Sequence, residues 1–501
     1  MMVFNKKIKY CILFFNILFF VILSRIVFNG DKTILSNQKY RDNLVLNISI
    51  DNQMCSYDKE SGVFFYSAES TNYKKWNIKL NSLYKLNYDI AKIDDNNFLI
   101  TAFNNDYYED IKLTITSLPI VDLQNLDIKS MLLSHTYPKV DKNIIFKFLA
   151  DNIEFETVEY YARFDENTKK ISRYDKIDLK IRGASSILYP KKSYKISFKN
   201  NIELLDLPKD DKYVLDALYV DSSKIRNLLS SYLWDLINNN QSVQNDLSGD
   251  FVELFIDNQY TGLYVLKEKI DKSVTKISDD GVILKSIFHM NDFYIDKLLS
   301  YNYSISDNSF LNFDIKYYNK ISFHSIIDKM KKYYANYDFD SINDNFDLSN
   351  YLNYYIYVIL LSGDDNIDYN YYLSLFDRDS KILITPWDMD LTWGLNWNDE
   401  TLFGLFSMQS SNDIEWINSV INKMDNKTLQ LLKKRYWELR KNAITMNTIN
   451  NYLDSYKSLL VNSGAAKRDS ERWYEYDIEY EIENIREWTK RRIEFLDQYF
   501  S

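Results

Sequence analysis

Three polar residues near two predicted strand ends have the types and spacing that could bind a metal ion. Asp365 and Asn370 are five positions apart, and the strand-like run YYLSLF follows them. A second short run, KILITP, leads to Trp387 and Asp388, with Asp390 two positions further on. If the two runs lie side by side, the oxygens of Asp365, Asn370 and Asp388 converge. Such oxygens are the hard ligands that Mg²⁺ prefers beside phosphates.

Protein kinases use the same order of residues: an Asp, an Asn five residues later, and a metal-binding Asp after a strand pair. In that scheme the first Asp orients the acceptor hydroxyl, while the Asn and the later Asp hold the metal. A calcium loop is the competing metal site, but no D-x-[DN]-x-[DN]-G loop ending in Glu is present. A solvated acidic turn is the non-functional alternative. We expect Asp388 to be partly buried, because it stands between Trp387 and Met389 after an apolar strand, and a buried acid needs a partner.

A second segment, residues 177–199, has the composition of a phosphate-binding turn. One predicted strand ends at Arg182, a Gly-Ala-Ser-Ser turn that includes Ser185 follows, and the next strand begins near Lys192 and contains Lys195. Exposed amides, hydroxyls and cations of this kind bind phosphate oxygens. Lys195 alternates with apolar neighbours, so we expect it on the opposite face of its strand. A solvated hairpin with surface lysines is the alternative.

The composition excludes several classes of function. The formal net charge of −10 argues against a general nucleic-acid binder. Cys11 and Cys55 are the two cysteines, so there is no disulfide framework and no thiolate zinc site. The three histidines are widely spaced and form no HExxH-type pair, and no GxSxG elbow supports a serine nucleophile. Any chemistry must therefore use carboxylates, amides, lysine and arginine.

The elements that must position these residues indicate an α+β protein with more than one domain. Residues 31–116 contain short alternating runs such as NNFLITAF and DIKLTITSL, which are typical of a small β-rich domain. Residues 117–501 mix strand-like and helical patterns, and the part from about 411 to 501 is helical. We therefore expect one mixed domain with a helical C-terminal part, preceded by the β-rich domain.

The first 30 residues form an N-terminal hydrophobic segment. Lys6, Lys7 and Lys9 precede an apolar run from Tyr10 to about Leu23. Positive charge before such a run is typical of a signal peptide or a membrane anchor. We predict that this segment attaches the chain to a membrane or directs its secretion; an ordinary buried helix is the alternative.

The segments together resemble the CotH family of spore-coat, kinase-like proteins over about residues 117–501. The matching stretches are LKIRGASSILYPKKSYKISFK, DALYVDSSKIRN, FVELFIDNQYTGLYVLKEKID, DDNIDYNYYLSLFD and TPWDMDLTWG. The resemblance implies an atypical protein-kinase-like fold that uses ATP and Mg²⁺ to phosphorylate serines of other coat proteins.

The resemblance also implies roles for individual residues. Asp365 matches the family's catalytic-loop aspartate, Asn370 and Asp388 match its metal-binding residues, and Asp390 is a further candidate at the metal. The phosphate-side motif contains Arg182, Ser185, Lys192 and Lys195; Glu268 and Lys269 stand where a hinge to the adenine is expected; and Arg226 is either an inward-facing partner for phosphate or part of a structural ion pair.

The predicted function is a Mg²⁺-dependent ATP phosphotransferase that acts on Ser/Thr of spore coat or cell-surface proteins. The alternative is a non-catalytic coat scaffold or a surface module that binds a partner, which the hydrophobic N-terminus and the β-rich domain support. A third hypothesis is the transfer of AMP instead of a phosphoryl group.

Overall fold

The computed structural model describes residues 38–68, 72–125, 157–166, 171–183, 185–205, 207–238, 249–275, 277–287, 290, 292–301, 309–396, 407–408 and 414–501. These residues form two compact units. The first runs from residue 38 to Ile115 apart from Ser67 and Ala68, which belong with the second unit, from Thr116 to Ser501. The hydrophobic segment of residues 1–30 lies outside the described residues. Within the described ranges, no helix has the length and apolar character needed to cross a membrane.

The first unit is built almost entirely from strands. In its larger sheet the order is β4 (Ser56–Asp58), β5 (Val63–Ser67), β9 (Tyr107–Thr116), β8 (Asn97–Phe103) and β7 (Asn87–Lys92), with β1 (Lys39–Tyr40) parallel to β9. The smaller sheet has the order β3 (Gln53–Met54), β2 (Asn47–Ile50) and β6 (Ile78–Asn81). Alternate residues of β8, such as Phe98 and Ile100, are buried, which gives the unit its core.

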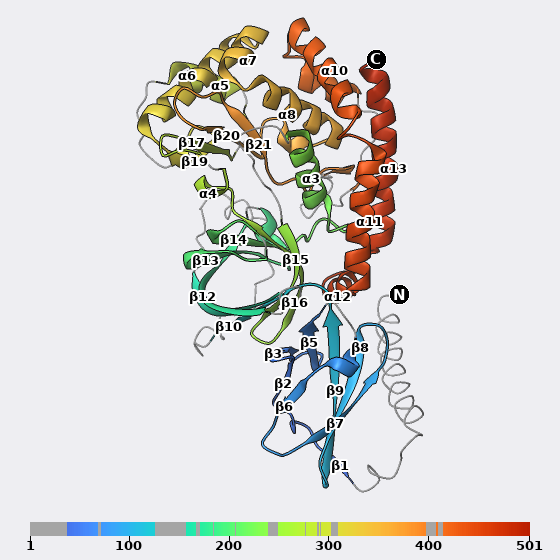
Figure 1. Ribbon diagram of the computed structural model, residues 1–501. Coiled ribbons are helices and arrows are strands. Elements are labelled where there is room, and N and C mark those ends of the chain that lie inside the picture. The colour runs from blue at the N-terminus through green and yellow to red at the C-terminus, as the bar shows by residue number, and fades with distance from the viewer. Residues whose placement is uncertain are drawn as a thin grey trace, which may run out of the picture. The chain divides into compact units, whose positions relative to one another are not determined.

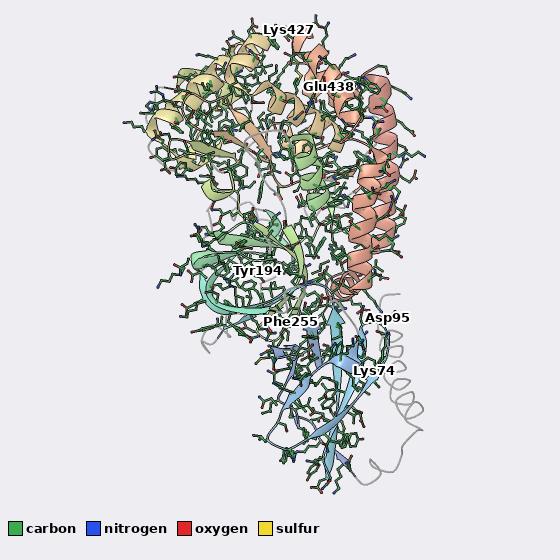
Figure 2. The ribbon with its side chains drawn as sticks, viewed as in Figure 1. Lys74, Asp95, Tyr194, Phe255, Lys427 and Glu438 are labelled. Carbon is green, nitrogen blue, oxygen red and sulfur yellow. The ribbon has the colours of Figure 1, made fainter. Side chains whose placement is uncertain are left out.

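A closed β-barrel begins the second unit (Figure 1). Its strands follow the order β10 (Ile120–Gln124), β11 (Val158–Glu166), β12 (Ile171–Arg182), β13 (Ser193–Ile202), β14 (Asp210–Asp216), β16 (Tyr260–Glu268) and β15 (Gly249–Ile256). The parallel pairing of β10 with β15 closes the ring. Tyr194 of β13 and Phe255 of β15 mark two of its strands among the side chains of Figure 2.

The barrel interior follows from the alternation of apolar residues. In β13, Tyr194, Ile196 and Phe198 are buried and belong to one apolar cluster with residues from the other strands. Lys195, which lies between them, is half-buried and faces away from that cluster, as its alternation with apolar residues predicts. The barrel therefore packs its own core and leaves its outer face and its turns for other contacts.

A second sheet and a group of helices follow the barrel in the chain. The sheet order is β18 (Ser309–Phe310), β19 (Phe313–Tyr318), β17 (Val282–Ser286), β20 (Tyr371–Leu375) and β21 (Leu383–Pro386). Helix α3 (Arg226–Asn238) lies between the barrel strands β14 and β15, and α4 (Lys272–Thr275) connects the barrel to β17. Within the second sheet, α5 (Asp292–Ser300) follows β17, and α6 (Lys320–Asn336), α7 (Phe339–Asn345) and α8 (Leu348–Leu361) lie between β19 and β20. A two-stranded ribbon, β22 (Leu395–Asn396) with β23 (Ser407–Met408), comes after β21.

The C-terminal part is helical from residue 414 onward. Its helices are α9 (Ile414–Ile421), α10 (Asn426–Arg440), α11 (Met446–Asn462), α12 (Ala465–Arg472) and α13 (Ile478–Tyr499). One apolar stripe of α13, which contains Ile482, Ile485 and Trp488, is buried in the same cluster as most of α8. The α+β class predicted from the sequence is confirmed.

Helix α8 sets the position of the acidic segment that the sequence singles out. The Asp347 side chain accepts a hydrogen bond from the backbone N–H of Asn350 and so caps the start of the helix. Ser362 ends it in the left-handed conformation, with φ 54°. The short 3-10 helix η5 (Asp364–Asn366) follows at once. Because α8 is buried and capped at both ends, its C-terminal end fixes the position of the backbone at Asp365.

Candidate active site

A cleft of about 630 Å³ lies between the barrel and the second sheet. One wall comes from the barrel: the turn between β12 and β13, and the residues that follow β14. The other comes from η5, the start of β20, the segment after β21, and β17. Its polar lining includes Arg182, Ser186, Lys191, Asp216, Asn227, Lys285, Asp365, Asn370, Asp388 and Asp390.

The structure brings Asp365, Asn370 and Asp388 to the same cleft. The half-buried Tyr369 lines the same cleft. Burial and the charges of Asp388 and Asp365 raise its pKa. Asn370 is buried and has a φ of 52°, and Asp388 has a φ of 59°, so both turn in the left-handed conformation at their strand ends. This conformation is uncommon for residues other than glycine and recurs at functional sites.

A buried asparagine that the sequence analysis did not select ties the two strand ends together. The Asn366 side-chain amide donates hydrogen bonds to the carbonyl oxygens of Asn370 at 3.0 Å and of Trp387 at 2.9 Å. The Trp387 backbone N–H in turn donates to the Asn370 carbonyl oxygen at 2.9 Å. Because Asn366 is 1% exposed, these bonds are shielded from water and fix the spacing of the two ends.

The prediction that Asp388 is partly buried is wrong: its side chain is exposed to the cleft. Its neighbours Trp387 and Met389 are buried, as expected, and the Met389 backbone N–H donates to the Asn227 side-chain oxygen at 2.8 Å. The left-handed backbone at Asp388 turns its carboxylate outward while the chain on both sides stays buried. An exposed carboxylate at a cleft wall is available to a ligand.

The ionisation of Asp390 is opposed by its surroundings. Burial, together with the negative charges of Asp388, Asp216 and Asp221, raises its pKa well above the ordinary value. Tyr189, from the opposite turn, lies close enough that burial and the charge of Asp390 raise its pKa to about 12. Clustered carboxylates of this kind are stabilised by a cation.

The turn between β12 and β13 carries the residues predicted to bind phosphate, and they separate into two groups. Arg182 lines the cleft, with its guanidinium carbon 5.5 Å from the centre of the Trp387 ring. Gly183 has a φ of 129°, and a Cβ atom there would lie 2.0 Å from the Ser186 hydroxyl, so the turn requires glycine. The backbone of Ser185 lies in the 3-10 helix η4 (Ser185–Leu188), and its side chain is outside the described part.

Lys192 and Lys195, the two lysines of this motif that the sequence analysis selected, do not line the cleft. The Lys192 ammonium is buried and donates to the carbonyl oxygens of Ile187 at 2.6 Å and of Tyr189. It therefore closes the turn from behind, and burial lowers its pKa to about 8. Lys195 lies on the outer face of the barrel, where burial and the neighbouring Lys212 and Lys180 lower its pKa.

The chain matches the family described as "CotH kinase protein" over residues 179–496, which is more than half of its length. It belongs to the CotH family. A search of curated proteins finds no match. Membership suggests a kinase-like protein associated with the spore coat.

Two further residues that the CotH resemblance implicated, Arg226 and Glu268, do not line the cleft. Arg226 is fully buried: its guanidinium pairs with Asp221 and donates to the Thr392 carbonyl oxygen at 3.1 Å. Of the two roles left open for it, the structure shows the ion pair. Glu268 ends β16 and lines a smaller cavity of about 30 Å³ that adjoins the cleft, since Trp387 and Asp388 line both; this volume holds water but no adenine ring.

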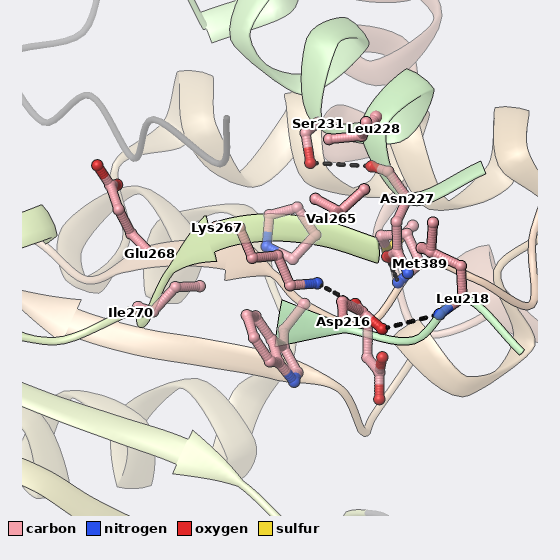
Figure 3. A pocket seen from close by; sticks show the side chains of 13 residues that line it. Asp216, Leu218, Asn227, Leu228, Ser231, Val265, Lys267, Glu268, Ile270 and Met389 are labelled. Carbon is pink, nitrogen blue, oxygen red and sulfur yellow. Dashed lines mark hydrogen bonds and ion pairs between the residues drawn. The ribbon is translucent and has the colours of Figure 1, made fainter. Parts of the chain in front are cut away.

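Sequence reasoning missed three residues of the CotH cleft region. The Lys267 ammonium pairs with the Asp216 carboxylate at 2.5 Å, as Figure 3 shows, and lies 5.1 Å from the centre of the Trp387 ring. Lys285 reaches the cleft from β17. A usable signal existed for Lys285, since it is the one charge in the apolar run GVILKSI, whereas the pairing of Asp216 with Lys267 depends on strand contacts that the sequence does not state.

The described residues show which groups of this CotH protein could hold a metal ion. No cluster of three or more His, Cys, Asp or Glu side chains in the described ranges is arranged to hold a metal by itself. Asn370 and Asp388 could instead supply protein oxygens to a Mg²⁺ ion whose other ligands are water and phosphate, the usual mode for this ion. The repulsion that raises the pKa of Asp390 fits a cation at this wall.

Proposed function

We propose that the chain is a Mg²⁺-dependent ATP phosphotransferase of atypical protein-kinase-like fold that phosphorylates Ser or Thr of spore coat or surface proteins. The observation that carries the proposal is the meeting of Asp365, Asn370 and Asp388 on one cleft wall, opposite Arg182 and the glycine-containing turn. Family membership supports the same activity. The N-terminal segment would attach this enzyme to a membrane.

Each wall of the cleft has a distinct task in this proposal. Arg182 and the backbone of Gly183, Ser185 and Ser186 bind the phosphate chain from the barrel side. Asn370 and Asp388 would hold Mg²⁺, which would supply positive charge to neutralise the phosphates and to offset the repulsion at Asp390. Asp365 accepts a hydrogen bond from the substrate hydroxyl and orients it toward the phosphorus atom.

Positioning and charge supply most of the rate in such a site. The hydrogen bonds of Asn366 keep the ends of η5 and β21 at a fixed spacing. The backbones of Asp365 and Asp388, which are next to these bonds in the chain, are therefore held at a fixed distance from each other. The volume of about 630 Å³ suits a nucleotide-sized ligand.

The test compares two aspartates with a matched third one. Asp388→Asn is expected to abolish Mg²⁺-dependent ATP binding in calorimetry, because it removes a metal ligand. Asp365→Asn is expected to leave binding largely intact and to lower phosphoryl transfer by about 10²–10⁴-fold. Asp379→Asn, at an exposed hairpin tip where the carboxylate pairs with Arg378, is the control and should change neither quantity.

If both cleft variants phosphorylate a coat protein at the wild-type rate, the kinase assignment is wrong. If the wild-type chain binds no ATP at millimolar nucleotide, the result favours the alternative function, a non-catalytic coat scaffold. The mass added to a product separates phosphoryl transfer from AMP transfer.

A further inference from the structure

Trp387 lies at the centre of a group of cations that no sequence motif brought together. Arg182 approaches its ring from β12 at 5.5 Å, Lys267 from β16 at 5.1 Å, and Lys285 from β17 at 5.5 Å. Two of these residues belong to the barrel and one to the second sheet. Since Trp387 is 8% exposed, its ring forms a fixed platform where the two walls of the cleft meet.

The charges in this group are unequally compensated. Lys267 is paired with Asp216 at 2.5 Å. Within the described part of the chain, neither Arg182 nor Lys285 has a carboxylate oxygen within 4.0 Å. Like charges that are partly removed from water repel one another, and an anion between them relieves that repulsion.

We propose that Lys285, with Arg182 and Lys267, forms a polyphosphate-binding site on Trp387, and that Lys285 is the lysine that contacts the phosphate chain of the nucleotide. This inference rests on the proposed function and names a residue outside the phosphate-side motif. Lys191 is fully buried and paired with Asp469 at 2.6 Å. Lys192 is occupied by carbonyl oxygens of the turn, and Lys195 lies on the outer face of the barrel. Lys285 lines the same cleft as Arg182 and Asp388.

The placement of Lys285 suits a chain of phosphates that spans the cleft. Burial, opposed by Asp388 and reinforced by Arg182, lowers its pKa to about 8, so its charge is only partly compensated by its surroundings. A phosphate chain held by Gly183 and Ser186 at one end and by a metal at Asp388 at the other would pass over Trp387. Desolvated ammonium and guanidinium groups bind phosphate oxygens more strongly than exposed ones.

A purely structural role makes a different prediction. One cation over an indole ring adds packing and a modest attraction, but further cations beside the same ring repel the first. If Lys285 only packs against Trp387, its replacement by methionine should leave anion binding unchanged. The two roles therefore differ in binding and not only in stability.

The experiment measures binding of inorganic tripolyphosphate to the full chain by calorimetry, without nucleotide. Lys285→Met is expected to weaken binding by on the order of tenfold or more, as for the loss of a charged hydrogen bond. Lys285→Arg should restore most of the affinity. The control is Lys316→Met: Lys316 lies on the adjacent strand β19 and is paired with Asp314 at 2.8 Å, so its loss should change affinity less than twofold.

Circular dichroism and thermal unfolding must first show that the variants are folded. Equal affinity of Lys285→Met and the wild type for tripolyphosphate overturns the proposal, and so does a wild type that binds no tripolyphosphate. The outcome is distinguishable from failure of the kinase assignment. A chain that binds tripolyphosphate through Lys285 but transfers no phosphoryl group refutes only the activity, whereas an active kinase with unaltered Lys285→Met binding refutes only this site.

Discussion

Two charged clusters in the second unit differ in how completely their charges are paired. In the first, beneath the barrel turn, one Asp469 oxygen accepts hydrogen bonds from the Lys191 ammonium at 2.6 Å and from the Leu263 backbone N–H at 2.9 Å. Its other oxygen accepts from the Tyr476 hydroxyl at 3.1 Å and lies 3.6 Å from the Lys224 ammonium. In the second, at the cleft, Asp388 and Asp390 lie near other carboxylates, and Lys285 lies near Arg182.

The difference separates structural charges from functional ones. The Asp469 carboxylate is fully buried; burial opposes its ionisation, yet Lys191 and Lys224 hold its pKa below the ordinary value. At the cleft the pKa shift has the opposite sign: burial and neighbouring acids raise the pKa of Asp390. The charges around Asp469 are paired with opposite charges, whereas like charges repel one another at the cleft. Such repulsion is retained in a folded protein where a bound ligand can relieve it.

The largest expected effect comes from breaking the paired cluster. Asp469→Asn should lower the free energy of unfolding by about 3–5 kcal/mol, because it leaves two buried ammonium groups without a counter-charge. Denaturant unfolding measures it. The control is Asp454→Asn, whose exposed carboxylate pairs with Arg486 at 2.7 Å and should contribute less than about 1 kcal/mol. A loss below that level for Asp469→Asn would show that the pairing is not structural.

The sequence predicted the acid wall of the cleft better than the phosphate wall. Asp365, Asn370 and Asp388 are close together along the chain, and one strand pair, β20 with β21, is enough to bring them to one cleft. Short-range patterns predict such a pair well. The outward turn of Asp388 escaped prediction, because Asp adopts the left-handed backbone more often than most residues but far from always, so its presence in the sequence does not specify that conformation.

The phosphate wall depends on contacts between residues far apart in the sequence. Lys285 meets Arg182 only because the barrel turn and β17 form opposite walls, and Lys267 meets Asp216 across the strand pair β14 and β16. The sequence motif near Arg182 drew attention to Lys192 instead, a lysine that closes the turn. The barrel itself was read only as strands, because closure depends on the parallel pairing of β10 with β15.

A smaller effect tests how tightly α12 holds the barrel. Gly262 has a φ of 118°, and a Cβ atom there would lie 2.4 Å from an Asp469 oxygen and 2.9 Å from the Trp473 indole nitrogen. Gly262→Ala should therefore destabilise the second unit by about 1–3 kcal/mol through overpacking. Gly62→Ala, with a φ of 69° and no atom within 4 Å of the added Cβ, isolates the backbone strain. Scanning calorimetry measures both; equal losses would mean that the α12 contact yields easily.

The smallest expected effect is an increase in stability instead of a loss, and it tests the mutually repelling acids at the cleft. Asp390 has a folded-state pKa above its ordinary value of 3.8, so its contribution to stability is complete below pH 3.8 and is lost as the pH rises through the raised pKa. Asp390→Asn should therefore make the ligand-free chain more stable than the wild type at pH 8, by on the order of 1 kcal/mol. The difference should vanish near pH 3.8.

Mg²⁺ provides the second half of that test. A cation at the cleft wall removes the repulsion among Asp388, Asp390 and Asp216, so Mg²⁺ should raise the melting temperature of the wild type at pH 8 more than that of Asp390→Asn. Thermal unfolding with and without Mg²⁺, at pH 4 and pH 8, gives all four comparisons. If Asp390→Asn is the less stable chain at pH 8, Asp390 belongs with Asp469 among the structural charges, and the contrast between the two clusters fails at this residue.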